Sequence, residues 1–333
     1  MFELSFIWAG IIAFSVLTYV VLDGFDLGVG ILFPLADGER EKATMMNSIA
    51  PIWDGNETWL VLGGGGLFAV FPLAYAVIMP ALYMPIILML LALIFRGVAF
   101  EYRWRTQRWK PVWDVAFFGG SIVAAFMQGI ALGALVQGIE FADRAYAGGW
   151  WDWLSVFSLL TGFAVVVGYA LLGATWIIMK TEGSLQRRMQ SHAWFLAVGT
   201  LGFIGIVSIL TPFQDPEYFQ RWLSLPGSIF SVLMPGAVLA AAWALFTGLN
   251  AGKDAQPFFA AQSIFVLCFI GIGISFYPNI VPPGLTIVEA AAPDESLRFT
   301  LYGTAVLVPM ILAHTAYAYW VFRGKVNPEE GYH

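Results

Sequence analysis

The chain has 333 residues, of which 59% are hydrophobic and only 11% are charged. Ordinary soluble domains contain about 25% charged residues, and the mean hydropathy of +0.76 is also far above theirs. A soluble fold of this composition could not cover its apolar surface, so the composition predicts an all-α polytopic membrane protein. The net charge of −6 argues against a nucleic acid partner.

About nine apolar stretches are long enough to cross the ~30 Å hydrocarbon core of a membrane. The first begins near the N-terminus without the basic leader or the cleavage site of a signal peptide, so we expect it to be retained. The second is short and rich in glycine, which is typical of close helix packing in membranes. In chain order, the predicted spans are 5–32, 57–72, 76–102, 111–136, 153–179, 192–212, 226–249, 257–277 and 299–322.

The basic residues of the predicted loops are distributed unevenly between the two sides of the membrane. The positive-inside rule places the more basic side in the cytoplasm, so we expect a periplasmic N-terminus and a cytoplasmic C-terminus. Arg96 belongs to neither side, because it lies within the third predicted span. The cytoplasmic side holds twelve residues, namely Arg40, Lys42, Arg103, Arg105, Arg108, Lys110, Lys180, Arg187, Arg188, Lys253, Arg323 and Lys325, and the other side holds three, namely Arg144, Arg221 and Arg298.

No soluble domain or low-complexity linker interrupts the predicted spans, so the function is expected to lie within the membrane. We treat residues 1–333 as a single membrane domain. Four spans, four further spans and a ninth are compatible with two related bundles, 1–136 and 153–277, followed by a peripheral helix at 299–322.

Charged residues occur inside several predicted spans, where each would cost roughly 2.5 to 3.5 kcal/mol at a helix centre. Asp23 and Asp26 are three residues apart and share one helix face, and Arg96 is the only buried cation that we expect at their depth. This arrangement is equally compatible with a proton entry path or cation site and with an ion-pair cluster that only holds three helices together. The set comprises Asp23, Asp26, Asp54, Glu57, Arg96, Glu101 and Asp114, all mapped to the cytoplasmic half.

Glu101 and Asp114 are predicted to be shallower than the rest of this set and close to basic loop residues. For these two carboxylates, interfacial salt bridges are the favoured interpretation.

Histidine and cysteine are too scarce for most cofactor sites. His333 is the last residue, while His192 and His314 fall in different spans, so a facing pair of haem or copper ligands is not expected. His314 is interpreted as a packed, hydrogen-bonded residue. The single Cys268 lies in an apolar stretch, which leaves no disulfide and no thiolate cluster for a metal.

Four segments carry a resemblance to a known family. DGFDLGVG (23–30), MNSIAPIWDGNETWLVLGGGGLFAVFPLAYA (46–76) and FRGVAFEYR (95–103) resemble subunit II of cytochrome bd-type quinol oxidases, and VLVPMILAHTAYAYW (306–320) resembles the last helix of that subunit. The resemblance covers essentially the whole chain and is tightest in its first 105 residues. The amino-acid sequences of these segments are more similar to the cyanide-insensitive branch of the family than to the enterobacterial type.

The resemblance implies a heterodimeric oxidase of the bacterial inner membrane that oxidises quinol and reduces dioxygen to water. It assigns haem b and haem d to subunit I and none to this chain, which would support subunit I with two four-helix bundles plus a peripheral helix. Lipid, quinone and a small single-helix accessory subunit are further expected partners. Some relatives hold a structural quinone in this subunit, but no residue is assigned to it here.

The resemblance also implies a proton-uptake path from the cytoplasm. By motif, Asp54 of WDGNETW lies near its mouth and Arg96 lies beside it, and we add the other carboxylates of the region as candidates, namely Asp23, Asp26, Glu57 and Glu101. The sequence departs from the enterobacterial pattern in having Glu57 where glutamine is common and Glu101 where aspartate is common. Both differences retain polarity.

Two other functions remain open from the residues themselves. In a secondary transporter, the carboxylates would bind sodium, protons or a cationic substrate. In an assembly scaffold, the buried charges would only hold the helices in register. Co-purification with a haem-bearing partner would favour the oxidase subunit over the transporter.

Overall fold

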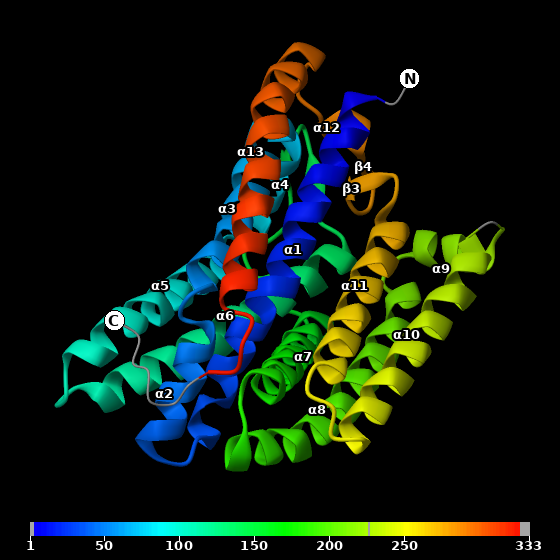
Figure 1. Ribbon diagram of the computed structural model, residues 1–333. Coiled ribbons are helices and arrows are strands. Elements are labelled where there is room, and N and C mark those ends of the chain that lie inside the picture. The colour runs from blue at the N-terminus through cyan, green and yellow to red at the C-terminus, as the bar shows by residue number, and fades with distance from the viewer. Residues whose placement is uncertain (1–2, 226, 327–333) are drawn as a thin grey trace.

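The structure, a computed structural model, describes residues 3–225 and 227–326 and is almost entirely helical (Figure 1). The first part of the chain forms α1 (Leu4–Leu32), the short 3-10 helix η1 (Phe33–Leu35), α2 (Gly38–Ile49), α3 (Trp53–Val70), α4 (Pro72–Ala81), α5 (Tyr83–Arg105) and α6 (Lys110–Gln137). The second part forms α7 (Val156–Lys180), α8 (Gly183–Leu210), η2 (Thr211–Phe213), α9 (Pro216–Leu223), α10 (Gly227–Asn250), α11 (Gln256–Phe276), α12 (Ile287–Ala290) and α13 (Asp294–Val321).

The only strands in the described ranges are two short antiparallel hairpins in the connections between long helices. β1 (Phe141–Ala142) pairs with β2 (Ala145–Tyr146), and β3 (Asn279–Val281) pairs with β4 (Leu285–Thr286). Both hairpins lie at the same end of the molecule as the start of α13 (Figure 1).

Eight described helices are long and apolar enough to cross a membrane, namely α1, α5, α6, α7, α8, α10, α11 and α13. They confirm the prediction of an all-α polytopic membrane protein. Most of their ends lie within a few residues of the predicted spans, although α8 and α13 begin well before 192 and 299.

The second and third predicted spans need correction. The second corresponds to α3, which is not among the eight because its first turns carry the polar residues of WDGNETW. The third, predicted as a single helix over 76–102, is divided into α4 and α5 at Leu82. Pro85 lacks the N–H that would continue the helix by donating to the carbonyl of Ala81, and Pro80 lies just before the break.

Helices α1 and α7 pack together at the centre of the molecule. Helix α1 also contacts α3 and α6, and α7 also contacts α6, α8 and α11. A Cβ added to Gly28 would lie 1.9 Å from the carbonyl oxygen of Tyr169, and one added to Gly173 would lie 2.2 Å from the carbonyl carbon of Gly28. The two backbones therefore touch where both helices present glycine, which is the usual means of close helix packing in membranes.

Helix α13 lies along α1 and α3 (Figure 1). Near its first turn, Trp8 Nε1 donates to the carbonyl of Leu297 at 3.0 Å, and the N–H of Ala292 donates to the carbonyl of Val70 at 2.9 Å. At its other end, the Tyr319 hydroxyl reaches α3. Helix α13 is thus attached at both ends, although its apolar face is mostly exposed in the single chain.

The segment after α13 is fastened to the turn between α7 and α8. Lys180 Nζ donates to the carbonyls of Phe322 and Gly324, the latter at 2.7 Å, and the N–H of Val326 donates to the Lys180 carbonyl at 2.8 Å. Lys325 forms an ion pair of 2.7 Å with Asp254, in the turn between α10 and α11.

Further ion pairs gather the basic connections at one end of the molecule. Glu39 and Glu41 of α2 pair with Lys110, at 3.4 Å, and with Arg188 respectively. The connections after α1, α5, α7, α10 and α13 therefore meet at one end, which is the lower end in Figure 1. The twelve basic residues assigned to one side from the sequence lie in these connections or in the helix turns next to them.

Candidate functional site

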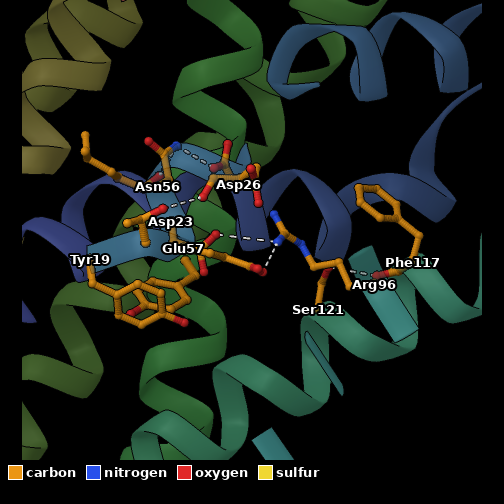
Figure 2. Close-up of polar contacts among 12 residues, drawn as sticks. Tyr19, Asp23, Asp26, Asn56, Glu57, Arg96, Phe117 and Ser121 are labelled. Carbon is orange, nitrogen blue, oxygen red and sulfur yellow. Dashed lines mark hydrogen bonds and ion pairs between the residues drawn. The ribbon is translucent and has the colours of Figure 1, made fainter. Parts of the chain in front are cut away.

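Four charged side chains lie together where α1, α3 and α5 meet (Figure 2). Asp23 and Asp26 come from α1, Glu57 from the second turn of α3 and Arg96 from the middle of α5. Asp23, Asp26 and Arg96 are fully buried, whereas the Glu57 side chain retains 23% of its exposure. We refer to these four residues as the ion cluster.

Arg96 is the centre of the ion cluster. Its Nη1 atom lies 2.9 Å from Glu57 Oε1 and 3.5 Å from Asp23 Oδ1. The guanidinium also lies over the rings of Trp53 and Phe100, 5.8 Å and 5.6 Å from their centroids, and cation–π contacts of this kind partly replace lost hydration. Its Nε and Nη2 atoms have no hydrogen-bond partner within the described residues.

The cluster has three carboxyl groups and one cation. One guanidinium can neutralise one carboxylate, and like charges so close together do not all ionise without further counter-charge. Both oxygens of Asp23 and Oδ1 of Asp26 lack a hydrogen-bond partner among residues 3–225 and 227–326, although Asp23 lies within ion-pair distance of Arg96. The ion cluster therefore contains carboxyl groups that can take up and release protons.

Two neutral side chains that the sequence analysis did not single out complete the site. Asn56 Nδ2 donates to Asp26 Oδ2 at 2.6 Å, as Figure 2 shows, and the Tyr319 hydroxyl donates to Asn56 Oδ1 at 3.0 Å. Asn56 lies within the WDGNETW motif, which was a signal for its involvement. Tyr319 also lay within a quoted segment, 306–320, but nothing in that segment pointed to the cluster, and only the packing of α13 against α3 brings the side chain there.

Asp54 lies outside the ion cluster, on its exposed side. It lies in the first turn of α3, three residues before Glu57, and its side chain is exposed. Among the described ion pairs, Arg96 is joined to Glu57 and not to Asp54, so Glu57 is the carboxylate of the motif that contacts the arginine. From the surface inward, the order is Asp54, then Glu57, then Arg96 with Asp23.

Glu101, included among the candidate residues, lies apart from the ion cluster. It pairs with Arg105 at 3.2 Å, and both side chains are mostly exposed. Asp114 pairs with Lys42 at 2.7 Å and with Arg103 at 2.5 Å. The interpretation of Glu101 and Asp114 as salt-bridged residues near basic connections is confirmed.

Arg96 is not the only buried cation among the described residues, although it is the only one there that pairs with Asp23 or Glu57. Arg103, which the sequence analysis assigned to a loop, is fully buried within the last turn of α5. Its Nη2 atom lies 3.0 Å from Glu39, and its guanidinium lies over the ring of Phe33. Because α5 continues to Arg105, Arg103 faces α2 and η1 instead of solvent.

The histidines take separate positions. His192 Nδ1 lies 2.8 Å from the carbonyl of Arg188, on its own helix. His314 is exposed on α13, which corrects the expectation that it is packed in the protein. His333 lies outside the described residues. Within residues 3–225 and 227–326, no group of three or more His, Cys, Asp or Glu side chains is arranged to hold a metal ion.

Comparisons with known proteins agree with the motifs. The chain is 33% identical to the cytochrome bd-I ubiquinol oxidase subunit 2 of Escherichia coli K12, with 98% of this chain and 96% of that protein aligned. It is 30% identical to the cytochrome bd ubiquinol oxidase subunit 2 of Bacillus subtilis 168, with 99% of both chains aligned.

A solved structure supports the fold. A chain of the bd oxidase from Geobacillus thermodenitrificans superposes with a TM-score of 0.80 at 16% identity, over 97% of this chain and 99% of that chain. The family model of cytochrome bd terminal oxidase subunit II matches residues 4–322. The chain therefore belongs to the cytochrome bd terminal oxidase subunit II family.

Proposed function

We propose that this chain is the subunit of a quinol:dioxygen oxidoreductase of the bacterial inner membrane that supports a haem-bearing subunit I and ligates no haem itself. Membership of the subunit II family and full-length similarity to two ubiquinol oxidase subunits support this proposal. Haem b and haem d belong to subunit I, and quinol is the electron donor. The family membership favours this function over an ion-coupled transporter.

We further propose about nine membrane crossings, with a periplasmic N-terminus and a cytoplasmic C-terminus. Helix α3 supplies the additional crossing, because its 18 residues extend over about 27 Å. Contacts at both ends support this, since Asn56 meets Tyr319 near the end of α13 and Val70 meets Ala292 just before its start. The gathering of the basic connections at one end supports the orientation.

The proposed division into two four-helix bundles follows the helix contacts. Helix α1 contacts α3 and α6, and α6 contacts α5, which suits a first bundle within 1–136. Helix α7 contacts α8 and α11, and α10 contacts both α8 and α11, which suits a second bundle within 153–277. Helix α13 contains residues 299–321 of the peripheral helix predicted at 299–322, and it is peripheral to both bundles.

The ion cluster is proposed to belong to a proton-uptake path that opens at the cytoplasmic end. The observation that carries this proposal is the graded burial of its carboxylates: Asp54 is exposed, Glu57 is partly exposed, and Asp23 and Asp26 are fully buried. A carboxylate in contact with water can exchange protons with the cytoplasm, and Arg96 stabilises negative charge further in. Glu101 is left out of this path, because it pairs with Arg105 at the surface.

The substitution Asp54→Asn tests this proposal. It retains the shape of the side chain and removes its titration, and no ion pair with Arg96 is lost. We expect near-normal haem content in the purified oxidase and a roughly tenfold decrease in quinol oxidation per haem, which corresponds to about 1.4 kcal/mol of barrier. Haem content and turnover are measured on the same preparation.

Glu182→Gln is the matched control, because Glu182 is an exposed carboxylate at the α7–α8 turn on the same end of the molecule. It should leave both quantities unchanged. Unchanged turnover per haem in Asp54→Asn would refute the role of Asp54 in proton entry. Loss of haem incorporation would instead assign Asp54 to assembly.

A further inference from the structure

A second polar network lies beside the ion cluster and takes no part in the path proposed above. It joins Tyr19 of α1, Gln128 of α6 and Tyr169 of α7. The Tyr169 hydroxyl donates to Gln128 Oε1 at 2.8 Å, and Gln128 Nε2 donates to the Tyr19 hydroxyl at 2.8 Å. Three helices thus contribute one side chain each to a chain of hydrogen bonds.

The direction of these hydrogen bonds leads to Asp23. Because the Tyr19 oxygen accepts from Gln128, its own O–H is left to donate. Asp23 lies four residues further along α1, on the same helix face, and interacts electrostatically with Tyr19. Neither Asp23 carboxylate oxygen has a hydrogen-bond partner among the described residues, so both have lone pairs left to accept one. Figure 2 shows Tyr19 beside the ion cluster.

The two tyrosines are held firmly in place. Tyr19 and Tyr169 are only 3% and 2% exposed, and a buried tyrosine hydroxyl needs a hydrogen-bond partner. The ring of Tyr169 lies directly against Gly24, where an added Cβ would be 2.8 Å from its Cε1 atom. The absence of a side chain at Gly24 therefore allows the Tyr169 ring to approach α1 and its hydroxyl to reach Gln128.

We propose that Gln128 and Tyr169 are positioning residues that orient the Tyr19 hydroxyl toward Asp23, so that the ion cluster receives a hydrogen bond from the interior of the protein. This inference rests on the proposed proton-uptake path. The donated hydrogen bond stabilises Asp23 as the carboxylate partner of Arg96. Glu57 and Asp54, on the solvent side of the arginine, are then left to exchange protons.

The substitution Tyr19→Phe in the complete oxidase removes one hydroxyl and retains the ring. We expect haem content to stay unchanged and turnover per haem to decrease roughly tenfold, the lower end of the effect of losing one hydrogen bond to a charged group. Infrared difference spectra of the reduced and oxidised enzyme provide a second readout. The carboxyl signal that disappears in Asp23→Asn should change in Tyr19→Phe.

Combined substitutions test whether the residues act through one another. Tyr19→Phe in an Asp23→Asn background should have no further effect on turnover, because the acceptor is already altered. Gln128→Leu should change the Asp23 carboxyl signal in the same direction as Tyr19→Phe. Gln262→Leu is the matched control, since Gln262 Nε2 donates to the backbone carbonyl of Val21 on α1 at 2.8 Å and shares no hydrogen bond with this network.

The outcomes separate the two proposals. If Asp23→Asn slows turnover while Tyr19→Phe and Gln128→Leu change neither turnover nor the carboxyl signal, the positioning role is wrong and the proton path stands. If Asp23→Asn and Asp54→Asn both leave turnover per haem unchanged, the path is wrong and the positioning role is overturned with it. If Gln262→Leu reproduces the effects of Tyr19→Phe, the network only stabilises helix packing and the inference is refuted.

Discussion

Arg96 is a single cation surrounded by carboxyl groups, so the stability of the cluster depends on it more than on any one acid. Its Nη1 atom is within 4 Å of both Glu57 and Asp23, and the side chain is fully buried. Removing one partner of a buried pair leaves a charge without compensation, which costs about 3 to 5 kcal/mol.

Arg96→Gln is therefore expected to prevent accumulation of the oxidase. The measurement is the amount of subunit and of haem in isolated membranes. Adding Asp23→Asn to Arg96→Gln removes one of the uncompensated charges and should restore part of the lost complex. Arg105→Gln is the control, because its pair with Glu101 is exposed and such pairs contribute little to stability. Wild-type amounts of Arg96→Gln would show that the cluster does not depend on this cation.

At the scale of elements, the crossing of α1 and α7 holds the carboxylates of α1 in place. Gly28 lies two residues after Asp26, and the backbone of α7 occupies the space that a side chain at Gly28 would need. A larger residue there must push α7 away, and the face of α1 that carries Asp23 and Asp26 would move with it.

Gly28→Ala should therefore lower the free energy of unfolding of the purified complex by about 1 to 3 kcal/mol, the usual cost of overpacking. It should also lower turnover per haem. The melting temperature, followed by loss of the haem spectrum, provides the measurement. Gly10→Ala on the same helix should be nearly neutral, since nothing lies within 4 Å of a Cβ at Gly10. Equal melting temperatures for both variants would contradict the close α1–α7 contact.

At the scale of the whole molecule, the orientation in the membrane is a prediction that can be tested without purification. A fluorescent protein fused after His333 should fluoresce, because it folds in the cytoplasm, and alkaline phosphatase at the same site should be inactive. Fusions after Asp143, in the turn between β1 and β2, should give the opposite pattern. Active phosphatase after His333 would reverse the assigned orientation.

The sequence alone was sufficient for the class of protein, most helix positions and the family. Hydrophobic length identifies a membrane span without knowledge of its neighbours, because the bilayer imposes one thickness on every crossing. The same reasoning identified Asp23, Asp26 and Arg96 as buried, since a charge within an apolar span is exceptional wherever it occurs. It failed at the break between α4 and α5, where the apolar stretch continues through Leu82 and the interrupting prolines, Pro80 and Pro85, were not taken as the end of a helix.

Which side chains meet was decided by the tertiary structure. Glu57 and not Asp54 contacts Arg96, Tyr319 reaches Asn56 from the far end of the chain, and Arg103 is buried where a loop residue was expected. These contacts depend on the rotation of each helix about its axis and on its packing against neighbours. Both are set by where small residues such as Gly28 allow two backbones to touch, and a one-dimensional pattern of hydrophobicity does not contain that information.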